Sequence, residues 1–187
     1  MTEQEQLELV KQNGFAIQFF DNPTEAICLA AVQQNGHAIQ FIKNPTQEVC
    51  LAAIKQNGFA IQYIDNPSEA VCLAAVKLDG LSIQDIKNPS IQDIKNASEA
   101  VCLAAVQQNG YAIYYIDNPS LEVCLAAVQQ NGYVIRFIKN PSEAIQEYLI
   151  EQDKNNIFNI PEDKLHPEIK KKYQYLLSMK RAGILSA

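Results

Sequence analysis

Long apolar runs are absent from this 187-residue sequence, and so is an excess of positive charge. No stretch approaches the ~20 consecutive apolar residues that a membrane-spanning helix requires. The first ten residues, MTEQEQLELV, are polar and acidic, which argues against a secretory signal. The net charge of −6 and the pI of about 4.9 argue against binding to nucleic acid or to an anionic membrane. We therefore expect a cytoplasmic protein in a reducing compartment.

Catalytic motifs are missing as well. The two histidines, His37 and His166, form no recognisable spacing with cysteine, serine or acidic residues, and no glycine-rich phosphate loop is present. The sequence therefore predicts a protein that is not an enzyme and that carries neither a metal nor another cofactor.

A unit of 22 residues repeats along most of the chain. Asn-Pro pairs begin at Asn22, Asn44, Asn66, Asn88, Asn118 and Asn140, and the spacing is 22 residues except for 30 residues between Asn88 and Asn118. The eight extra residues match a stutter, because SIQDIKNP at 82–89 recurs as SIQDIKNA at 90–97. Counting Asn96 as a unit start gives units that begin at residues 22, 44, 66, 96, 118 and 140, with an octapeptide insertion at 88–95. We interpret this insertion as a tolerated slip that forms a short helical bulge; the alternative is a bend or protrusion that is used for contact. A period of this length predicts a solenoid.

Each unit is predicted to hold two short helices. In the first half, Asn22 is expected to be the N-cap, with Pro at the first helical position and Glu25 completing a capping box, and Gly36 is expected to end the helix in a left-handed conformation. The run VCLAAV is apolar on all sides and should be covered all round. The second half, such as FAIQYID at 59–65, suits a helix or a strand. We favour a helix because the L-x-L strand signature of leucine-rich repeats is absent. The predicted fold is an all-α, αα-solenoid of 22-residue two-helix repeats.

Both ends of the array depart from the unit in a way that suggests polar caps. Residues 1–21 align with the unit as an N-terminal cap, but polar residues replace much of its apolar run. The last unit, from residue 140, is interpreted as partial, with Gln146 in place of the cysteine, so the solenoid spans 1–153. Residues 154–187 are expected to form a C-terminal loop and an amphipathic helix, with Ile169 and Tyr173 on one face. We prefer that this helix folds over the last unit; the alternative is an exposed partner-binding helix.

All five cysteines occupy one repeat position: Cys28, Cys50, Cys72, Cys102 and Cys124. Adjacent helices in a stack lie about 8–10 Å apart, which is too far for a disulfide or for one shared zinc ion. We expect them to be buried, reduced thiols.

Two further repeat positions are candidates for binding. Aromatic and amide residues flank two invariant isoleucines in the second half of the unit, and they form either a binding surface or inter-helix packing with a solvated margin. The candidate partner-binding residues are Gln40, Phe41, Gln62, Tyr63, Tyr111, Tyr114, Tyr115 and Arg136. A second position ends each unit with alternating charge: Asp21, Lys43, Asp65, Lys87, Asp117 and Lys139. The alternation is either a row of opposite charges on stacked neighbours or a remnant of a doubled 44-residue ancestor. We interpret it as specifying register and solubility.

The tandem units, opened by Asn-Pro and carrying CLAAV and Asn-Gly, resemble an uncharacterised family of short repeats found in bacteria, protists and large DNA viruses. The likeness covers about residues 22–145 and implies a repeat protein without a known activity. We expect a monomeric, non-catalytic scaffold that binds a protein partner along an extended helical-repeat face. The alternative is a structural subunit or spacer of a larger assembly, contacting neighbours through its ends.

Overall fold

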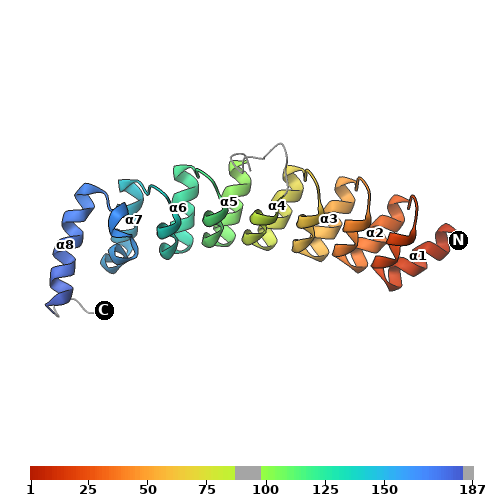
Figure 1. Cartoon of the computed structure of the whole chain (residues 1–187), viewed down its shortest axis with the longest axis horizontal. Coiled ribbons are helices and arrows are strands. Elements are labelled where there is room, and N and C mark those ends of the chain that lie inside the picture. Colours follow the sequence, from red (N-terminus) through yellow and green to blue (C-terminus); the bar gives the residue numbers. More distant parts are fainter. Residues whose placement is uncertain (87–97, 183–187) are drawn as a thin grey trace.

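The computed structural model describes residues 1–86 and 98–182. Within these residues the secondary structure is entirely helical, which confirms the predicted all-α repeat solenoid. In this part of the chain, seven α-helices, each followed by a 3-10 helix, stack in an elongated row from the N-terminus to a longer final helix (Figure 1). The insertion at 88–95 and its expected helical bulge lie outside the described residues.

The helices have closely similar lengths from unit to unit. The α-helices are α1 (Glu3–Gln12), α2 (Glu25–Gln34), α3 (Gln47–Gln56), α4 (Glu69–Leu78), α5 (Glu99–Gln108), α6 (Leu121–Gln130), α7 (Glu143–Gln152) and α8 (Pro167–Arg181). The 3-10 helices are η1 (Gly14–Phe19), η2 (Gly36–Phe41), η3 (Gly58–Tyr63), η4 (Gly80–Asp85), η7 (Gly110–Tyr115), η8 (Gly132–Phe137), η9 (Lys154–Asn159) and η10 (Glu162–Lys164).

The α-helices begin two residues later than the sequence suggested, so the prediction of an asparagine N-cap was wrong. The N-cap is a serine or threonine after the Asn-Pro pair, and Thr46, for example, accepts a hydrogen bond from the backbone N–H of Val49 at 3.3 Å. Asn44, Asn66 and Asn118 instead have φ near +50°. Asparagine tolerates this left-handed conformation, and a following proline disfavours the right-handed helical one.

The prediction for glycine was also wrong, because Gly36 begins the 3-10 helix instead of closing the α-helix in a left-handed conformation. Asn35 joins the two helices with an extended backbone (φ −150°), and its side chain accepts the N–H of His37 at 3.0 Å. Glycine is required here by a close approach: a Cβ at Gly36 would lie 2.6 Å from the carbonyl oxygen of Ala53 in the next unit.

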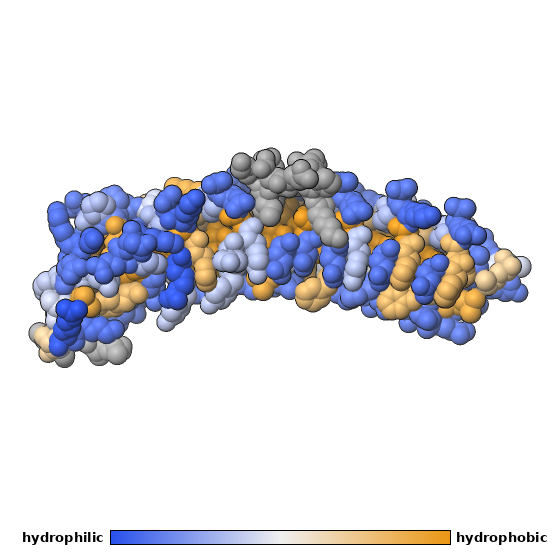
Figure 2. All heavy atoms as spheres, viewed as in Figure 1, coloured by the Kyte–Doolittle hydropathy of each residue, from blue (hydrophilic) through white to orange (hydrophobic). Residues whose placement is uncertain are grey.

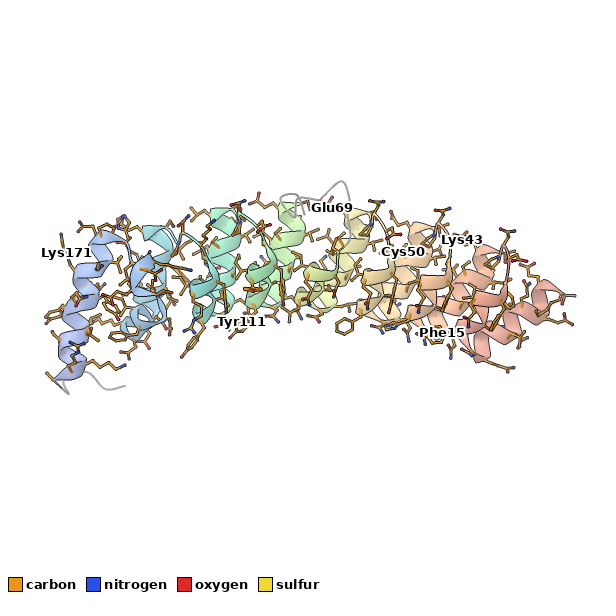
Figure 3. The ribbon with its side chains drawn as sticks, viewed as in Figure 1. Phe15, Lys43, Cys50, Glu69, Tyr111 and Lys171 are labelled. Carbon is orange, nitrogen blue, oxygen red and sulfur yellow. The ribbon has the colours of Figure 1, made fainter. Side chains whose placement is uncertain are left out.

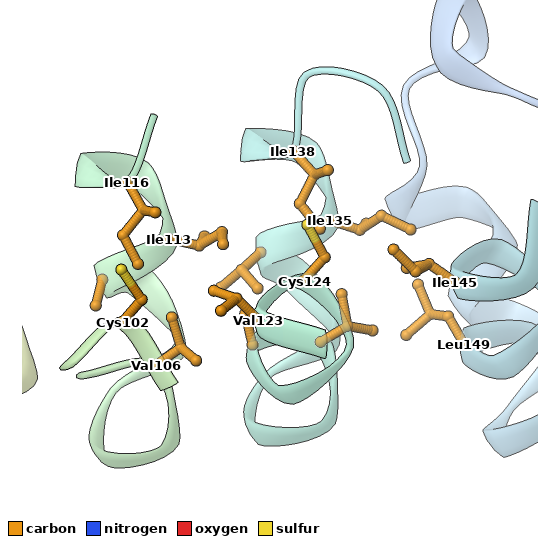
Figure 4. Packing of buried hydrophobic residues seen from close by; sticks show 14 of the residues in the cluster. Cys102, Val106, Ile113, Ile116, Val123, Cys124, Ile135, Ile138, Ile145 and Leu149 are labelled. Carbon is orange, nitrogen blue, oxygen red and sulfur yellow. The ribbon is translucent and has the colours of Figure 1, made fainter. Parts of the chain in front are cut away.

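The 3-10 geometry determines which residues of the second half are buried. A 3-10 helix has three residues per turn, so residues three apart lie in one row. The isoleucines equivalent to Ile39 are buried in every described unit, and Ile64, Ile116 and Ile138 are buried beside them. They pack against the valines and cysteines of the α-helices, as Figure 4 shows for Ile113, Ile116, Cys102 and Cys124. The α-helices are not covered all round, because Leu51 and Ala52 and their equivalents are only half-buried.

Side chains also join consecutive units through two hydrogen-bonded ladders. The last glutamine of an α-helix accepts the glycine N–H of the preceding unit, as in Gly14 N to Gln34 Oε1 (2.7 Å) and Gly36 N to Gln56 Oε1 (2.6 Å). At the other end of the helices, an N-cap hydroxyl donates to a glutamate of the preceding unit, as in Thr46 Oγ1 to Glu25 Oε1 at 2.6 Å. Leu78 replaces the glutamine at one junction, so the ladder is interrupted at Gly58.

The unit that begins at residue 140 is complete, which corrects the predicted boundary at 153. Ile157 and Ile160 occupy the two isoleucine positions on η9, and Asp153 caps this 3-10 helix. Gln146 is fully buried: its Nε2 donates to the carbonyl oxygens of Pro141 and Lys164, and its Oε1 accepts from His166 N. Helix α8 packs on this unit through Ile169 and Leu176.

Candidate functional site

The outer face of the 3-10 helices carries the candidate partner-binding residues, of which Gln62, Tyr63 and Tyr115 are half-buried and the others exposed. They lie on η2 (Gln40, Phe41), η3 (Gln62, Tyr63), η7 (Tyr111, Tyr114, Tyr115) and η8 (Arg136). We call this face the aromatic face. Phe15 and Tyr111 lie along one long edge of the molecule, opposite Lys43 and Glu69 (Figure 3). In the view of Figure 2, hydrophobic side chains alternate with polar ones along the row and do not form one broad patch.

Aromatic side chains on this face pair between consecutive units. The aromatic second residue of one 3-10 helix contacts the last residue of the next 3-10 helix, as in Phe15–Phe41 (ring centroids 5.9 Å apart) and Tyr111–Phe137 (6.0 Å). The pair His37–Tyr63 has the same arrangement, and Asn57 contacts His37 Nε2 at 2.7 Å. Part of the aromatic face is therefore packing between units, and its outer edges remain exposed.

The most exposed aromatic cluster lies on η7 and η8. Tyr114 is 66% exposed and contacts the rings of Tyr115 and Phe137, with centroid distances of 5.1 and 5.6 Å. Arg136 lies over the ring of Tyr133 at 5.4 Å from its centroid. Leu81 and Asp85 occupy the aromatic positions of η4, so the structure separates the candidates on η2 and η3 from those on η7 and η8.

Two clefts open between units at equivalent positions. The first cleft, of about 690 Å³, includes Gln40, Lys43 and Asn44 on one side and Tyr63 and Asp65 on the other. The second cleft, of about 550 Å³, lies between η7 and η8. It is lined at the equivalent positions by Tyr114, Asp117, Asn118, Phe137 and Lys139. The candidates Gln40, Tyr63 and Tyr114 thus line clefts that sequence reasoning did not find, because each cleft has walls from two units.

Four of the residues with alternating charge, Lys43, Asp65, Asp117 and Lys139, line these clefts. Within residues 1–86 and 98–182, Asp21, Lys43, Asp65, Asp117 and Lys139 make no ion pair. The reading of this row as charge pairing between stacked units therefore has no support from direct contacts.

All five cysteines are free and buried. The Cys50 thiol lies 4.0 Å from the carbonyl oxygen of Pro45 and lines the first cleft. Burial raises the pKa of this thiol above its ordinary value, and burial is also the main cause of the raised pKa of the other four. A raised pKa lowers the reactive thiolate fraction, as expected of structural cysteines.

No cluster of three or more histidine, cysteine or acidic side chains could hold a metal ion in the described part of the chain. None of the helices within the same residues combines the length and the apolar character needed to cross a membrane.

Comparison with known proteins gives a match to one family model over part of the chain. Residues 25–67 and 101–141 match the family described as domain of unknown function (DUF4116). Each matched segment spans close to two 22-residue units, and the match agrees with the resemblance to an uncharacterised repeat family. Neither curated proteins nor solved structures gave a match to the chain.

Proposed function

We propose that this protein is a non-catalytic scaffold that binds a protein partner along the aromatic face. The observation that carries the proposal is the exposed group of Tyr114, Tyr133 and Arg136 on η7 and η8. The Tyr114 ring contacts Phe137, and Arg136 lies over the ring of Tyr133. Tyrosine and arginine are the residue types most enriched at binding hot spots. Contacts with Tyr115 and Phe137 limit the motion of the Tyr114 ring, so less entropy is lost when a partner covers it.

The stacked architecture supports the same function. A row of nearly identical units presents the same positions repeatedly, which gives an extended surface for a partner. Because each unit contacts mainly its neighbours, side chains on this face can vary without disturbing the isoleucine core beneath them. In this proposal the protein is a cytoplasmic monomer, and binding of the partner requires no cofactor.

Affinity capture from the native cell extract tests the proposal. The variant Tyr114→Ala/Arg136→Ala should retain full helicity, and its affinity for the partner should fall at least about tenfold, since two hot-spot residues are truncated. Tyr175→Ala is the matched control, because Tyr175 is 64% exposed but lies on α8, away from the aromatic face. Equal capture by the wild type and by the Tyr114→Ala/Arg136→Ala variant would refute the proposed site.

A second candidate function, a structural subunit that contacts neighbours through its ends, is favoured by the charge of those ends. Helix α1 carries Glu5 and Glu8 beside the exposed side chain of Leu9, whereas α8 carries Lys171 and Lys172 beside Tyr175. Lys171 points away from the stack at its C-terminal end (Figure 3). Light scattering distinguishes the two functions, because end-to-end contact produces oligomers whose mass rises with concentration and falls with added salt.

A further inference from the structure

The two clefts allow the chemistry of the partner to be specified, an inference that rests on the proposed function. They occupy the same place in their units: Gln40 corresponds to Tyr114, Tyr63 to Phe137, and Pro45 to Pro119. Each cleft has an aromatic ring and isoleucines in its walls and open polar groups at its rim. A groove with an aromatic ring in its wall suits an extended, proline-rich segment, because such segments dock against aromatic side chains.

Asparagine carboxamides at the rim provide hydrogen bonds for a peptide backbone. Asn44 and Asn66 line the first cleft, and Asn118 and Asn140 line the second. Their side chains make no hydrogen bond to the described part of the chain. A carboxamide both donates and accepts, so it can bind a peptide group of a segment that has no internal hydrogen bonds.

The spacing of the units matches one backbone conformation. Packed helices lie about 8–10 Å apart, so equivalent rim residues in consecutive units are separated by roughly that distance. A polyproline II helix has three residues per turn and rises about 3.1 Å per residue, so every third side chain returns to the same face after about 9.3 Å. A β-strand fits less well, because residues three apart point to opposite faces.

The charges at the rim indicate where the bound segment would carry acidic and basic residues. Lys43 and Asp65 stand on the two sides of the first cleft, and Asp117 and Lys139 on the two sides of the second. Because none of the four is neutralised by an ion pair within the described residues, each can pair with a ligand charge. Acidic residues would face the lysines and basic residues the aspartates.

We propose that the clefts bind a polyproline II segment in which basic and acidic residues alternate at every third position. The probe is a fluorescent peptide of two Lys-Pro-Pro-Glu-Pro-Pro repeats. The matched control contains the same residues in the order two Lys-Pro-Pro and then two Glu-Pro-Pro, which preserves composition, net charge and conformation but removes the alternation. Fluorescence anisotropy at low salt should show at least about fivefold tighter binding of the alternating peptide, because only its Lys-Glu-Lys order matches Asp21, Lys43 and Asp65 together, whereas the sorted peptide places at least one like charge against this row.

Two variants test the assignment of individual groups. Lys43→Asp places three acidic residues in consecutive units, so it should weaken the alternating peptide about tenfold and strengthen an all-lysine Lys-Pro-Pro peptide. Asn44→Gly with Asn66→Gly removes the carboxamides while tolerating the positive φ of both positions, and should weaken every peptide several-fold.

Equal affinity for the alternating and sorted peptides, or no change on Lys43→Asp, would overturn this inference. The proposed function is tested separately by capture of the native partner. Capture that depends on Tyr114 and Arg136 but not on Lys43 would leave the scaffold function standing and exclude the alternating segment. If the protein binds the alternating peptide but capture of the native partner does not depend on Tyr114 and Arg136, the peptide inference stands and the proposed partner-binding site is excluded.

Discussion

Replacing one glycine by alanine tests how consecutive units are joined. A Cβ at Gly36 would lie 2.6 Å from the carbonyl oxygen of Ala53 and 2.8 Å from Gln56 Oε1, whereas ordinary contacts begin near 3.4 Å. The backbone of α3 would have to move by several tenths of an ångström. That movement also breaks the hydrogen bond from Gly36 N to Gln56 Oε1. Gly36→Ala should therefore loosen the junction between two units.

The expected magnitude follows from three contributions. Overpacking of a close contact costs about 1–3 kcal/mol. Loss of the hydrogen bond costs a further ~0.5–1.5 kcal/mol. Alanine also reduces the conformational entropy of the unfolded chain, which raises the free energy of unfolding by about 0.4–1 kcal/mol. This gain applies because Gly36 does not have a positive φ. We expect Gly36→Ala to lower the free energy of unfolding by about 2–3 kcal/mol.

Gly58→Ala is the internal control, since it makes the same change at the equivalent position of the next unit. The nearest atom to a Cβ at Gly58 is Leu78 Cβ, at an ordinary 3.6 Å, and the glutamine of the ladder is replaced by Leu78. This variant should be more stable than the wild type by about 0.4–1 kcal/mol. Urea unfolding followed by far-UV circular dichroism measures both variants under one set of conditions.

Opposite signs for the two substitutions are the essential outcome. If Gly36→Ala and Gly58→Ala changed the unfolding free energy equally, glycine would not be required by the close approach of units, and the described junction would be wrong. The variant Leu78→Gln sharpens the comparison, because it restores the missing member of the ladder. In that background Gly58→Ala should become destabilising, as the new glutamine amide occupies the space beside the glycine.

Three further predictions concern the core and the C-terminal end. Ala105→Leu should lower stability by about 1–3 kcal/mol in thermal melting, because Ala105 is fully buried between units. The five cysteines should react with a thiol reagent only after unfolding. Burial raises their pKa above the ordinary 9.0, so as the pH rises the unfolded state loses the thiol protons before the folded state does. The contribution of these thiols to stability should therefore be constant below about pH 8 and fall above about pH 9. Gln146→Leu should lower the free energy of unfolding by about 3 kcal/mol or more, since it leaves the Pro141 and Lys164 carbonyls and the His166 N–H without their partner. Limited proteolysis of this variant should cut the chain before α8. The control substitution Gln174→Ala, at an exposed position, should not have this effect.

The repeat frame and the isoleucine core could be predicted because the units of this one sequence can be aligned with one another. Positions equivalent to Ile39 never vary among the units, and all of those described are buried. The apolar run of each unit was expected to be buried, and its second alanine, such as Ala53 and Ala105, is fully buried. These inferences depend on side-chain volume and polarity alone, which a single sequence displays directly.

The type of the second helix could not be predicted from its spacing. Ile39 and Ile42 are three residues apart, a separation that places both on one side of an α-helix as well as of a 3-10 helix. A segment of six residues is too short for the two periods to diverge. Hydrogen bonds spanning three residues, such as Ile42 N to Ile39 O at 3.0 Å, make the distinction in the structure.

The roles of asparagine and glycine were misassigned because their local sequences allow two structures. Asn-Pro suits an N-cap with proline at the first helical position, and it also suits a left-handed turn followed by a serine or threonine cap. Asn-Gly suits a left-handed helix end, but Gly36 is required by Ala53 and Gln56, which belong to the following unit. The deciding contacts therefore lie about 20 residues away in the sequence.

The candidate site shows the same dependence on neighbouring units. The sequence displayed the alternation of Lys43 and Asp65, and pairing between stacked units was a natural interpretation of opposite charges one unit apart. The structure places these residues on opposite sides of a cleft of about 690 Å³ with no ion pair between them. A charge that stabilises no neighbour contributes little to the fold. Its regular alternation is then better explained by what the cleft accommodates, because a ligand that crosses several units must match their order as well as their composition.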